Sequence, residues 1–206
     1  MRVGDGGYDD GYAACPCFWG REPGSLVARF LARVPDIAGW DVLDAGCGEG
    51  KNAHALMMRG ARVTAVDTSA LALNNAREAW PSSTVTWVHA DVQRFTLPPA
   101  SFDLVVAYGL LHCLACRGEV EALVARFQAV TRAGGRHVIC AFNERRQELM
   151  AHPGFEPCLI PHSAYLDLYR DWDIEEASDE DLHETHPHNR IAHVHSLTRL
   201  TARRPV

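Results

Sequence analysis

One stretch decides the fold of this chain: Val42-Leu43-Asp44-Ala45-Gly46-Cys47-Gly48-Glu49-Gly50. Residues 41–45 predict a strand, and residues 52–59 predict a helix that Gly60 closes. The three glycines between them let the backbone approach a ligand closely at a helix N-terminus, where backbone amides point outward. This order predicts a ligand site at the end of the strand. The alternative is a turn with a purely structural role.

The loop does not suit a dinucleotide. A dinucleotide loop reads G-x-G-x-x-G, which would place its third glycine at position 51, where this chain has Lys51. The carboxylate of Asp44 would also repel a pyrophosphate. It suits a ligand that offers a cation or hydrogen-bond donors.

Two further carboxylates follow predicted strands. Asp67 comes directly after residues 62–66, and a carboxylate there can accept both hydroxyls of a ribose. Its alternative role is to cap the helix that begins at Ser69. Asp91 follows the predicted strand 85–88 and either takes an adenine amino group or is a simple turn residue.

Short apolar runs alternate with helical segments along the middle of the chain. A helix that Ser25 caps carries Val27, Phe30 and Leu31 on one face. The other expected elements are strands at 102–107 and 136–142 and helices at 69–80 and 119–132. This rhythm predicts a mostly parallel sheet with helices on both faces.

The two ends of the chain differ from this middle. Residues 1–24 are glycine-rich and predict an irregular arm, whereas residues 146–206 predict a helix at 163–169 and two strands, 172–176 and 190–201. These two strands are too close in sequence for a helical crossover and are expected to pair antiparallel at the sheet edge. We expect one domain over 1–206, with its ligand-binding core at 25–145.

Composition narrows the class of protein. The 206 residues suffice for a full core, and the net charge of −6 argues against a nucleic-acid partner. The most apolar strip, residues 104–111, is too short to cross a membrane, and the N-terminus lacks the pattern of a signal peptide. Seven cysteines in no disulfide pattern then predict a cytoplasmic protein with reduced thiols, either a monomer or a homodimer. Lys51 is the only lysine.

The motifs in this order resemble the class I S-adenosylmethionine-dependent methyltransferases. The resemblance covers roughly residues 25–145 and rests on Asp44-x-Gly46-x-Gly48-x-Gly50, Asp67, Asp91-Val92, Phe102-Asp103-Leu104-Val105-Val106 and Thr131-Arg132-Ala133-Gly134-Gly135. Within the family, residues 18–23, residues 49–52 and Trp172 look like the small tellurite-resistance (TehB-like) branch.

The resemblance implies a Rossmann-like sheet of seven strands whose last strand runs antiparallel between two neighbours. It implies S-adenosylmethionine as the methyl donor and S-adenosylhomocysteine as the product. The residues it assigns to the donor are Asp44, Gly46, Cys47, Gly48, Gly50, Asp67, Thr68, Asp91, Val92 and Tyr108.

An acceptor is expected beyond the carboxyl ends of the strands. His112 follows the predicted strand 102–107 and is a candidate base or orienting residue, or a purely structural histidine. The pairs Cys113-x-x-Cys116 and Cys15-Pro16-Cys17 either hold a soft oxyanion or metal or are simply buried thiols, and we favour the buried thiols.

Five histidines fall within thirteen positions near the end of the chain. His193 and His195 lie two apart in a predicted strand, so they share a face about 7 Å apart and are candidate catalytic residues. A metal, if one binds, would take His186, His188, His193 and His195, with Glu184 among the nearby carboxylates. We prefer a metal-free set of histidines that is solvated or lines the pocket.

The arm is rich in aromatic residues, which would be unusual on a free tail. We expect Tyr8, Tyr12, Phe18 and Trp19 to fold over the pocket as a lid that excludes water, with Arg21 meeting an acidic group on the donor or the acceptor. The alternative is packing against the first helix without contact to substrate.

The sequence thus predicts an enzyme that transfers a methyl group to a nucleophilic O, N or S atom of a small molecule, with no nucleic-acid or membrane partner. The alternatives are a metal-assisted methyltransferase, a methyltransferase of tellurite-, selenite- or arsenite-like oxyanions, and a donor-binding protein without catalysis.

Overall fold

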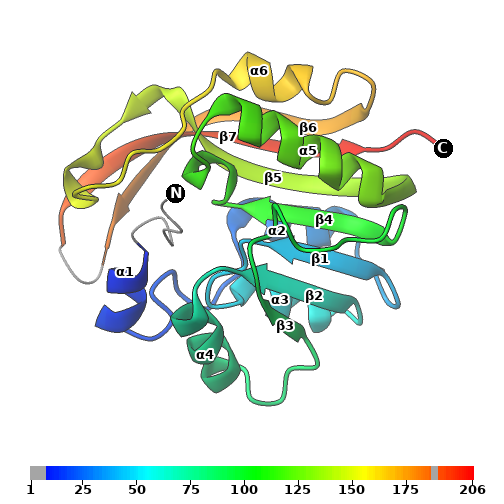
Figure 1. Cartoon of the computed structure of the whole chain (residues 1–206), viewed down its shortest axis with the longest axis horizontal. Coiled ribbons are helices and arrows are strands. Elements are labelled where there is room, and N and C mark those ends of the chain that lie inside the picture. Colours follow the sequence, from blue (N-terminus) through cyan, green and yellow to red (C-terminus); the bar gives the residue numbers. More distant parts are fainter. Residues whose placement is uncertain (1–7, 187–189) are drawn as a thin grey trace.

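A twisted sheet of seven strands forms the centre of the computed structural model, which describes residues 8–186 and 190–206 (Figure 1). The strand order is β3-β2-β1-β4-β5-β7-β6. Strands β1 to β5 pair in parallel, and β7 lies antiparallel between β5 and β6. The strands are β1 (Asp41–Ala45), β2 (Arg62–Asp67), β3 (Thr86–His89), β4 (Phe102–Tyr108), β5 (Thr131–Gln147), β6 (Asp173–Thr185) and β7 (Ala192–Arg203).

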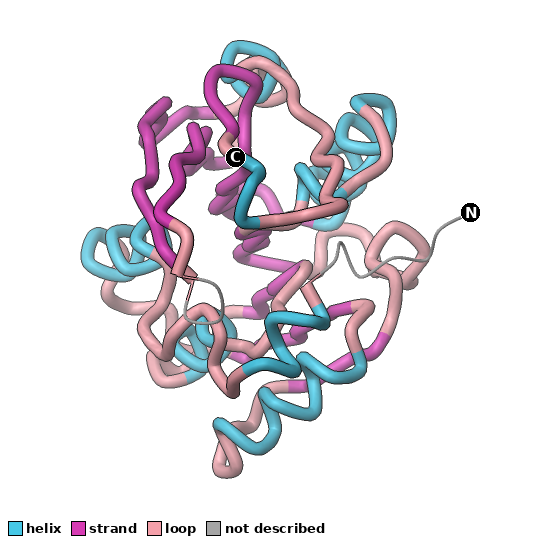
Figure 2. The backbone as a smooth tube through the Cα atoms, turned by 90° about the vertical axis from the view of Figure 1, so that its left-hand side faces the viewer, coloured by secondary structure: helices cyan, strands magenta, loops and turns pink. Residues whose placement is uncertain are grey.

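Helices cover both faces of this sheet, as the tube view in Figure 2 also shows. Neighbouring residues of a strand point to opposite faces, so Val42 and Leu43 of β1 belong to two different cores. On the Val42 side pack α2 (Ser25–Arg33), α3 (Lys51–Met57) and Leu73 of α4 (Ala70–Ala79). On the Leu43 side pack α5 (Arg117–Val130) and α6 (His162–Asp167).

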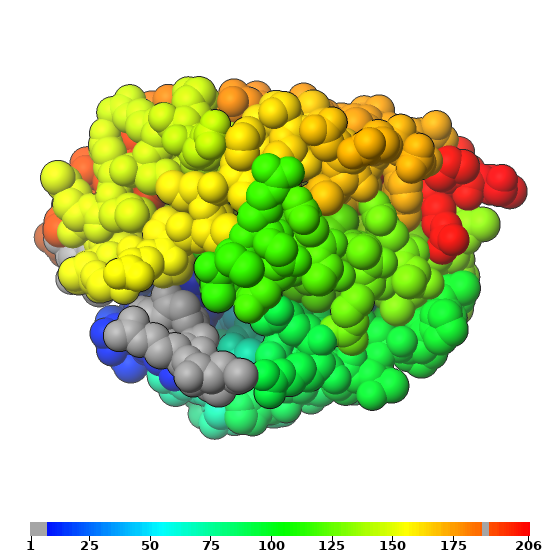
Figure 3. Space-filling view, turned by 45° about the horizontal axis from the view of Figure 1, so that its top comes forward, coloured from blue at the N-terminus to red at the C-terminus, as the bar shows by residue number. Residues whose placement is uncertain are grey.

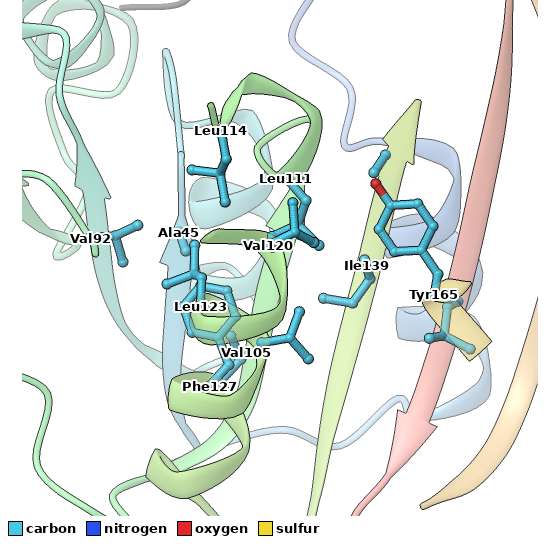
Figure 4. Packing of buried hydrophobic residues seen from close by; sticks show 14 of the residues in the cluster. Ala45, Val92, Val105, Leu111, Leu114, Val120, Leu123, Phe127, Ile139 and Tyr165 are labelled. Carbon is cyan, nitrogen blue, oxygen red and sulfur yellow. The ribbon is translucent and has the colours of Figure 1, made fainter. Parts of the chain in front are cut away.

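The larger core lies under α5. Figure 4 shows Leu123 and Phe127 of this helix facing Val105 of β4 and Ile139 of β5. All four side chains are buried, as the strands between two helical layers must be in a parallel sheet. The predicted α/β architecture and its antiparallel last strand are confirmed.

Three local expectations need correction. Ser25 is the first residue of α2, and Gly24 occupies the cap position without a side-chain hydrogen bond. By contrast, Ser69 does cap α4, because its Oγ accepts the Ala72 amide at 2.9 Å. The arm is not wholly irregular, since α1 (Asp9–Ala14) forms within it. The C-terminal strands are longer than predicted, and β7 is an interior strand because it also pairs with β5.

Short 3-10 turns complete the chain at Leu111–Cys113 and Leu149–Ala151. No helix among the described residues combines the length and the apolar character that crossing a membrane requires.

A buried histidine in β5 ties the sheet to the segment after α6. The Tyr169 hydroxyl donates to His137 Nδ1 at 2.7 Å, and His137 Nε2 donates to Thr131 Oγ1 at 2.8 Å. Thr131 in turn donates to the Phe127 carbonyl at 2.7 Å. Every polar atom of the neutral imidazole is therefore satisfied, and burial lowers the pKa of His137 to about 3.

This histidine makes the fold acid-sensitive. An unfolded chain binds a proton at His137 below about pH 6.5, whereas the folded chain does not until about pH 3. Its contribution is therefore complete above pH 6.5 and is lost as the pH falls through that window. Replacing His137 by Gln should reduce the slope of unfolding free energy against pH by about 1.4 kcal/mol per pH unit between pH 4 and 6. Urea unfolding at several pH values measures this slope, and an unchanged slope would contradict the assignment.

Candidate active site

The glycine loop joins the carboxyl ends of β1 and β2. The amides of Gly46 and Cys47 donate to the Val66 carbonyl at 2.8 and 3.1 Å. Gly46 has φ +68° and Gly48 has φ +51°, a region that L side chains rarely adopt. A side chain at Gly46 would also meet Leu110 at 3.0 Å. The loop is therefore a sharp left-handed turn that only glycine tolerates.

Asp44 lies directly before this loop, at the end of β1. Its carboxylate is 1% exposed, and neither oxygen has a hydrogen-bond partner of good geometry among the described residues. Burial raises the pKa of Asp44 to about 7, with only a partial offset from the Ala53 amide, and the nearby Asp67 raises it further. A buried carboxylate without a partner is costly, so this position is suited to a ligand with a cation or N–H donors.

Asp67 is part of the loop's own structure. Its Oδ2 accepts the Gly48 amide at 2.7 Å, and its Oδ1 accepts the Ser69 amide at 2.8 Å. Each carboxylate oxygen offers about two acceptor positions, so one remains on each for ribose hydroxyls. Burial raises the pKa of Asp67.

The other residues assigned to the donor differ in their surroundings. Asp91 forms a turn by accepting the Gln93 amide at 2.9 Å, and it also pairs with Arg94 at 3.6 Å, so the turn role is present in the structure. Val92 and Cys47 are buried, whereas Thr68 is exposed beside Asp67. Gly50 leaves room for Trp87, which a Cβ at position 50 would meet at 2.3 Å. Tyr108 packs its ring against Gly24.

A buried carboxylate that the sequence interpretation overlooked fastens the arm over the loop. Glu49 accepts the amides of Cys17 and Phe18 at 2.9 and 2.6 Å and the Asn75 side chain at 2.9 Å. The Lys51 ammonium donates to the Trp19 carbonyl at 2.8 Å. The arm therefore closes over the glycine loop and α4, and not over α2 as the alternative interpretation held.

The aromatic residues of the arm fill the space next to the loop. Tyr12 and Phe18 are buried against Ala72 of α4, and a Cβ on Gly48 would lie 2.9 Å from the Tyr12 hydroxyl. The ring of Tyr8 lies 5.8 Å from that of Phe155, so the arm borders the segment around residue 155 on the surface (Figure 3).

Arg21, which was expected to meet an acidic group on the donor or the acceptor, lies at the C-terminal end of α4. Its guanidinium donates to the Ala79 carbonyl at 2.8 Å and lies 4.7 Å from the centre of the Trp80 ring. Arg21 thus complements the C-terminal end of α4, outside the space beneath the arm.

His112 lies in the turn after β4, beneath Tyr8. Its Nδ1 accepts the Phe142 amide at 3.1 Å, so the proton of the neutral ring is on Nε2, which lies 3.3 Å from the Tyr8 hydroxyl. Burial lowers the pKa of His112 to about 3, and His195 and His152 lower it further. A neutral ring with Nδ1 occupied is a hydrogen-bond donor at Nε2 and a poor base.

Four histidines and one glutamate converge beyond Phe142. The group comprises His152, Glu184, His186, His193 and His195. His193 and His195 share a face of β7 as predicted, and both are buried. His188 falls outside the described residues, and His183 is exposed. His152 was not among the predicted ligands, because it is 34 residues from the nearest of the other histidines in the group and only the tertiary fold brings it close.

The cysteines do not form a comparable group. Within the described ranges, the one set of three or more convergent metal-ligating side chains contains no cysteine. All seven thiols are free, and Cys113 lies 3.7 Å from the Tyr8 hydroxyl with Cys116 exposed at the start of α5. The favoured interpretation of buried thiols fits Cys113, whose pKa burial raises to about 12.

Comparison with known proteins agrees with this geometry. Residues 42–135 match the family model described as a methyltransferase domain. An uncharacterized methyltransferase of Mycobacterium tuberculosis is 35% identical over 101 residues, which are 49% of this chain and 50% of the relative. The trans-aconitate 2-methyltransferase of Paracidovorax citrulli is 40% identical over 110 residues, 52% of this chain and 40% of the relative. The chain thus matches half or less of the length of these curated relatives.

Solved structures show the same fold. TehB from Haemophilus influenzae has a TM-score of 0.68 at 20% identity, covering 86% of this chain and 61% of that chain. The 1,6-didemethyltoxoflavin-N1-methyltransferase of Burkholderia thailandensis has a TM-score of 0.70 at 22% identity, covering 98% and 87%. Residues 42–135 thus carry a methyltransferase domain, and the chain as a whole shares the fold of these solved methyltransferase structures. Its likeness to TehB is one of fold.

The Glu49 contacts generate a test of how the arm is held. Glu49→Gln replaces one of the two acceptor oxygens by an NH2 group, which cannot accept an N–H hydrogen bond, so the arm should loosen. We expect at least tenfold faster hydrogen exchange at the Cys17 and Phe18 amides and a stability loss of about 1–3 kcal/mol. The control is Glu22→Gln, which changes an exposed glutamate of the same arm. Equal exchange in both variants would show that the carboxylate does not hold the arm.

Proposed function

We propose that this protein binds S-adenosylmethionine between the glycine loop and the arm and transfers its methyl group to a small-molecule nucleophile. The observation that carries this proposal is the buried, unpartnered carboxylate of Asp44 beside a left-handed glycine turn. Asp44 is the group that a methionine ammonium would satisfy, and Asp67 keeps free acceptor positions for ribose hydroxyls. The sulfonium of the bound donor supplies an activated methyl group.

The protein's own contribution is then mainly to position the acceptor and exclude water. The arm residues Tyr8, Tyr12 and Trp19 cover the donor side, and Phe142 and Phe155 flank His112 on the acceptor side. His112 Nε2–H donates to Tyr8 here and would orient an acceptor oxygen or nitrogen in the same way. We therefore assign His112 to orienting the acceptor and not to removing its proton.

The relatives' names support a small acceptor, because those of trans-aconitate, demethylmenaquinone and didemethyltoxoflavin methyltransferases refer to small molecules. An oxyanion acceptor held by thiols gains no support, since the group of convergent metal-ligating side chains among the described residues contains no cysteine. The alternative, a donor-binding protein without catalysis, would bind S-adenosylhomocysteine but show no turnover with any acceptor.

Replacing Asp44 by Asn tests both the donor site and the stability cost of its buried carboxylate. Asp44→Asn removes the charge that a methionine ammonium would pair with, so S-adenosylhomocysteine should bind at least tenfold more weakly in titration calorimetry. The ligand-free variant should be more stable at pH 8 by roughly 2–4 kcal/mol, because the buried carboxylate no longer has to ionise. The control Asp171→Asn alters an exposed aspartate and should change neither quantity. Unchanged affinity in Asp44→Asn would place the donor elsewhere.

Donor binding should also depend on pH through Asp44. In the ligand-free protein this carboxyl has a pKa of about 7, so it is largely protonated at pH 6 and ionised at pH 8. A cationic ligand group favours the ionised form, and the affinity for S-adenosylhomocysteine should rise severalfold from pH 6 to pH 8. Asp44→Asn should flatten this dependence. A profile that falls with pH in the parent protein would contradict the proposed pairing.

A further inference from the structure

We propose that His152, Glu184, His193 and His195 bind one divalent transition-metal ion that clamps the β6–β7 hairpin to the wall of the acceptor pocket. The ligand atoms of these four side chains all lie within 4.8 Å of one another. They come from three places in the chain: the segment after the 3-10 turn Leu149–Ala151, strand β6 and strand β7.

The separations fit one metal ion. His152 Nε2 lies 3.3 Å from His193 Nε2 and 3.2 Å from His195 Nε2. Glu184 Oε1 lies 3.4 Å from His193 Nε2 and 3.5 Å from His195 Nε2. Metal–ligand bonds of about 2.0–2.1 Å in a tetrahedral site hold ligand atoms roughly 3.3–3.4 Å apart. Four of the six separations therefore match a four-coordinate ion, and the other two are at most 4.8 Å.

The positions of the imidazole protons also favour a metal site. His193 Nδ1 donates to the Ile191 carbonyl at 2.7 Å, and His195 Nδ1 donates to Gln147 Oε1 at 2.7 Å. The amide nitrogen of Gln147 donates to two carbonyls, so its oxygen is the acceptor for His195. Both neutral rings thus carry their proton on Nδ1 and aim the Nε2 lone pair at the common centre. Such outer partners are what orient metal-binding histidines.

With both rings neutral these groups would repel, and a cation, either a proton or a metal ion, relieves the repulsion. The Nε2 lone pairs of His193 and His195 and a carboxylate oxygen of Glu184 face one another. The side chains of His193 and His195 are fully shielded from solvent, so water does not separate the lone pairs. Three imidazoles and a carboxylate are a donor set for zinc and its first-row neighbours, whereas magnesium and calcium prefer oxygen ligands alone.

The position of this site indicates a structural role. Four protein ligands close the coordination of a tetrahedral ion, which is typical of structural sites. His195 stacks on Phe142 at 4.2 Å between ring centres, and Phe142 stacks on His112 at 4.0 Å. On the other side His186, 3.1 Å from His152, contacts the rings of Phe18 and Trp19 in the arm. The ion would therefore hold together the hairpin, the His112 wall and the arm.

Metal titration of protein without a histidine tag tests the proposal. After treatment with a chelator, the chain should bind one equivalent of Zn²⁺ in calorimetry, with a rise in Tm on binding. Mg²⁺ at the same concentration should produce neither effect. Visible absorption of the Co²⁺ form should show the strong bands of a tetrahedral site. Absence of stoichiometric Zn²⁺ binding, or equal binding of Mg²⁺, would overturn the assignment.

Variants identify the ligands. His195→Gln and Glu184→Gln should each weaken Zn²⁺ binding at least tenfold, whereas His183→Gln, an exposed histidine of the same strand as Glu184, should bind like the parent. Equal binding by all three would place the ion elsewhere.

The same samples separate this inference from the proposed function. Circular dichroism confirms that each variant is folded, and S-adenosylhomocysteine titration of the chelated protein reports on the donor site alone. Donor binding without Zn²⁺ binding would refute the metal site and leave the proposed function standing. Zn²⁺ binding without donor binding would do the reverse.

Discussion

One buried carboxylate connects most of what is distinctive in this molecule. Glu49 sits within the glycine loop, and its oxygens gather amides from the arm and the side chain of Asn75 from α4. A charged group at 6% exposure persists only with several N–H partners, so the arm and α4 must be in place for the loop to keep its shape. The loop in turn fixes Asp44 and Asp67 at the edge of the sheet. The glycine loop, the arm and α4 are thus one hydrogen-bonded unit.

The sheet itself followed from local sequence. The strands β1, β2 and β4 are apolar runs between two helical layers, and their limits came within two residues of the expected ones because burial on both faces leaves a continuous signal. The length of β6 was missed. Most of its side chains are exposed or half-buried, and Asp179, Asp181 and Glu180 look like a loop until β7 pairs beside them.

The site shows the same division. Asp44 and the glycine turn were predicted because the geometry of a loop depends on adjacent residues. The role of Glu49 was missed because its partners in the arm lie some thirty positions earlier. The histidines of β7 were expected to share a face and do. The metal-free interpretation was preferred because histidines that are close in sequence need not converge in space. His152, brought in by the fold, makes the convergence visible, and the signal for it was only a lone histidine before Pro153 and Gly154.

Lys51, which follows the glycine loop, carries the single lysine amine of the chain. Its ammonium holds the Trp19 carbonyl, and burial lowers its pKa. Since it is the only lysine side chain, amine chemistry has a single side-chain target in this protein, and that target lies under the arm. Because this side chain is half-buried and bonded to the arm, a reagent that acylates amines would modify position 51 faster when the arm is lifted. The acylation rate at Lys51 would therefore report on movement of the arm.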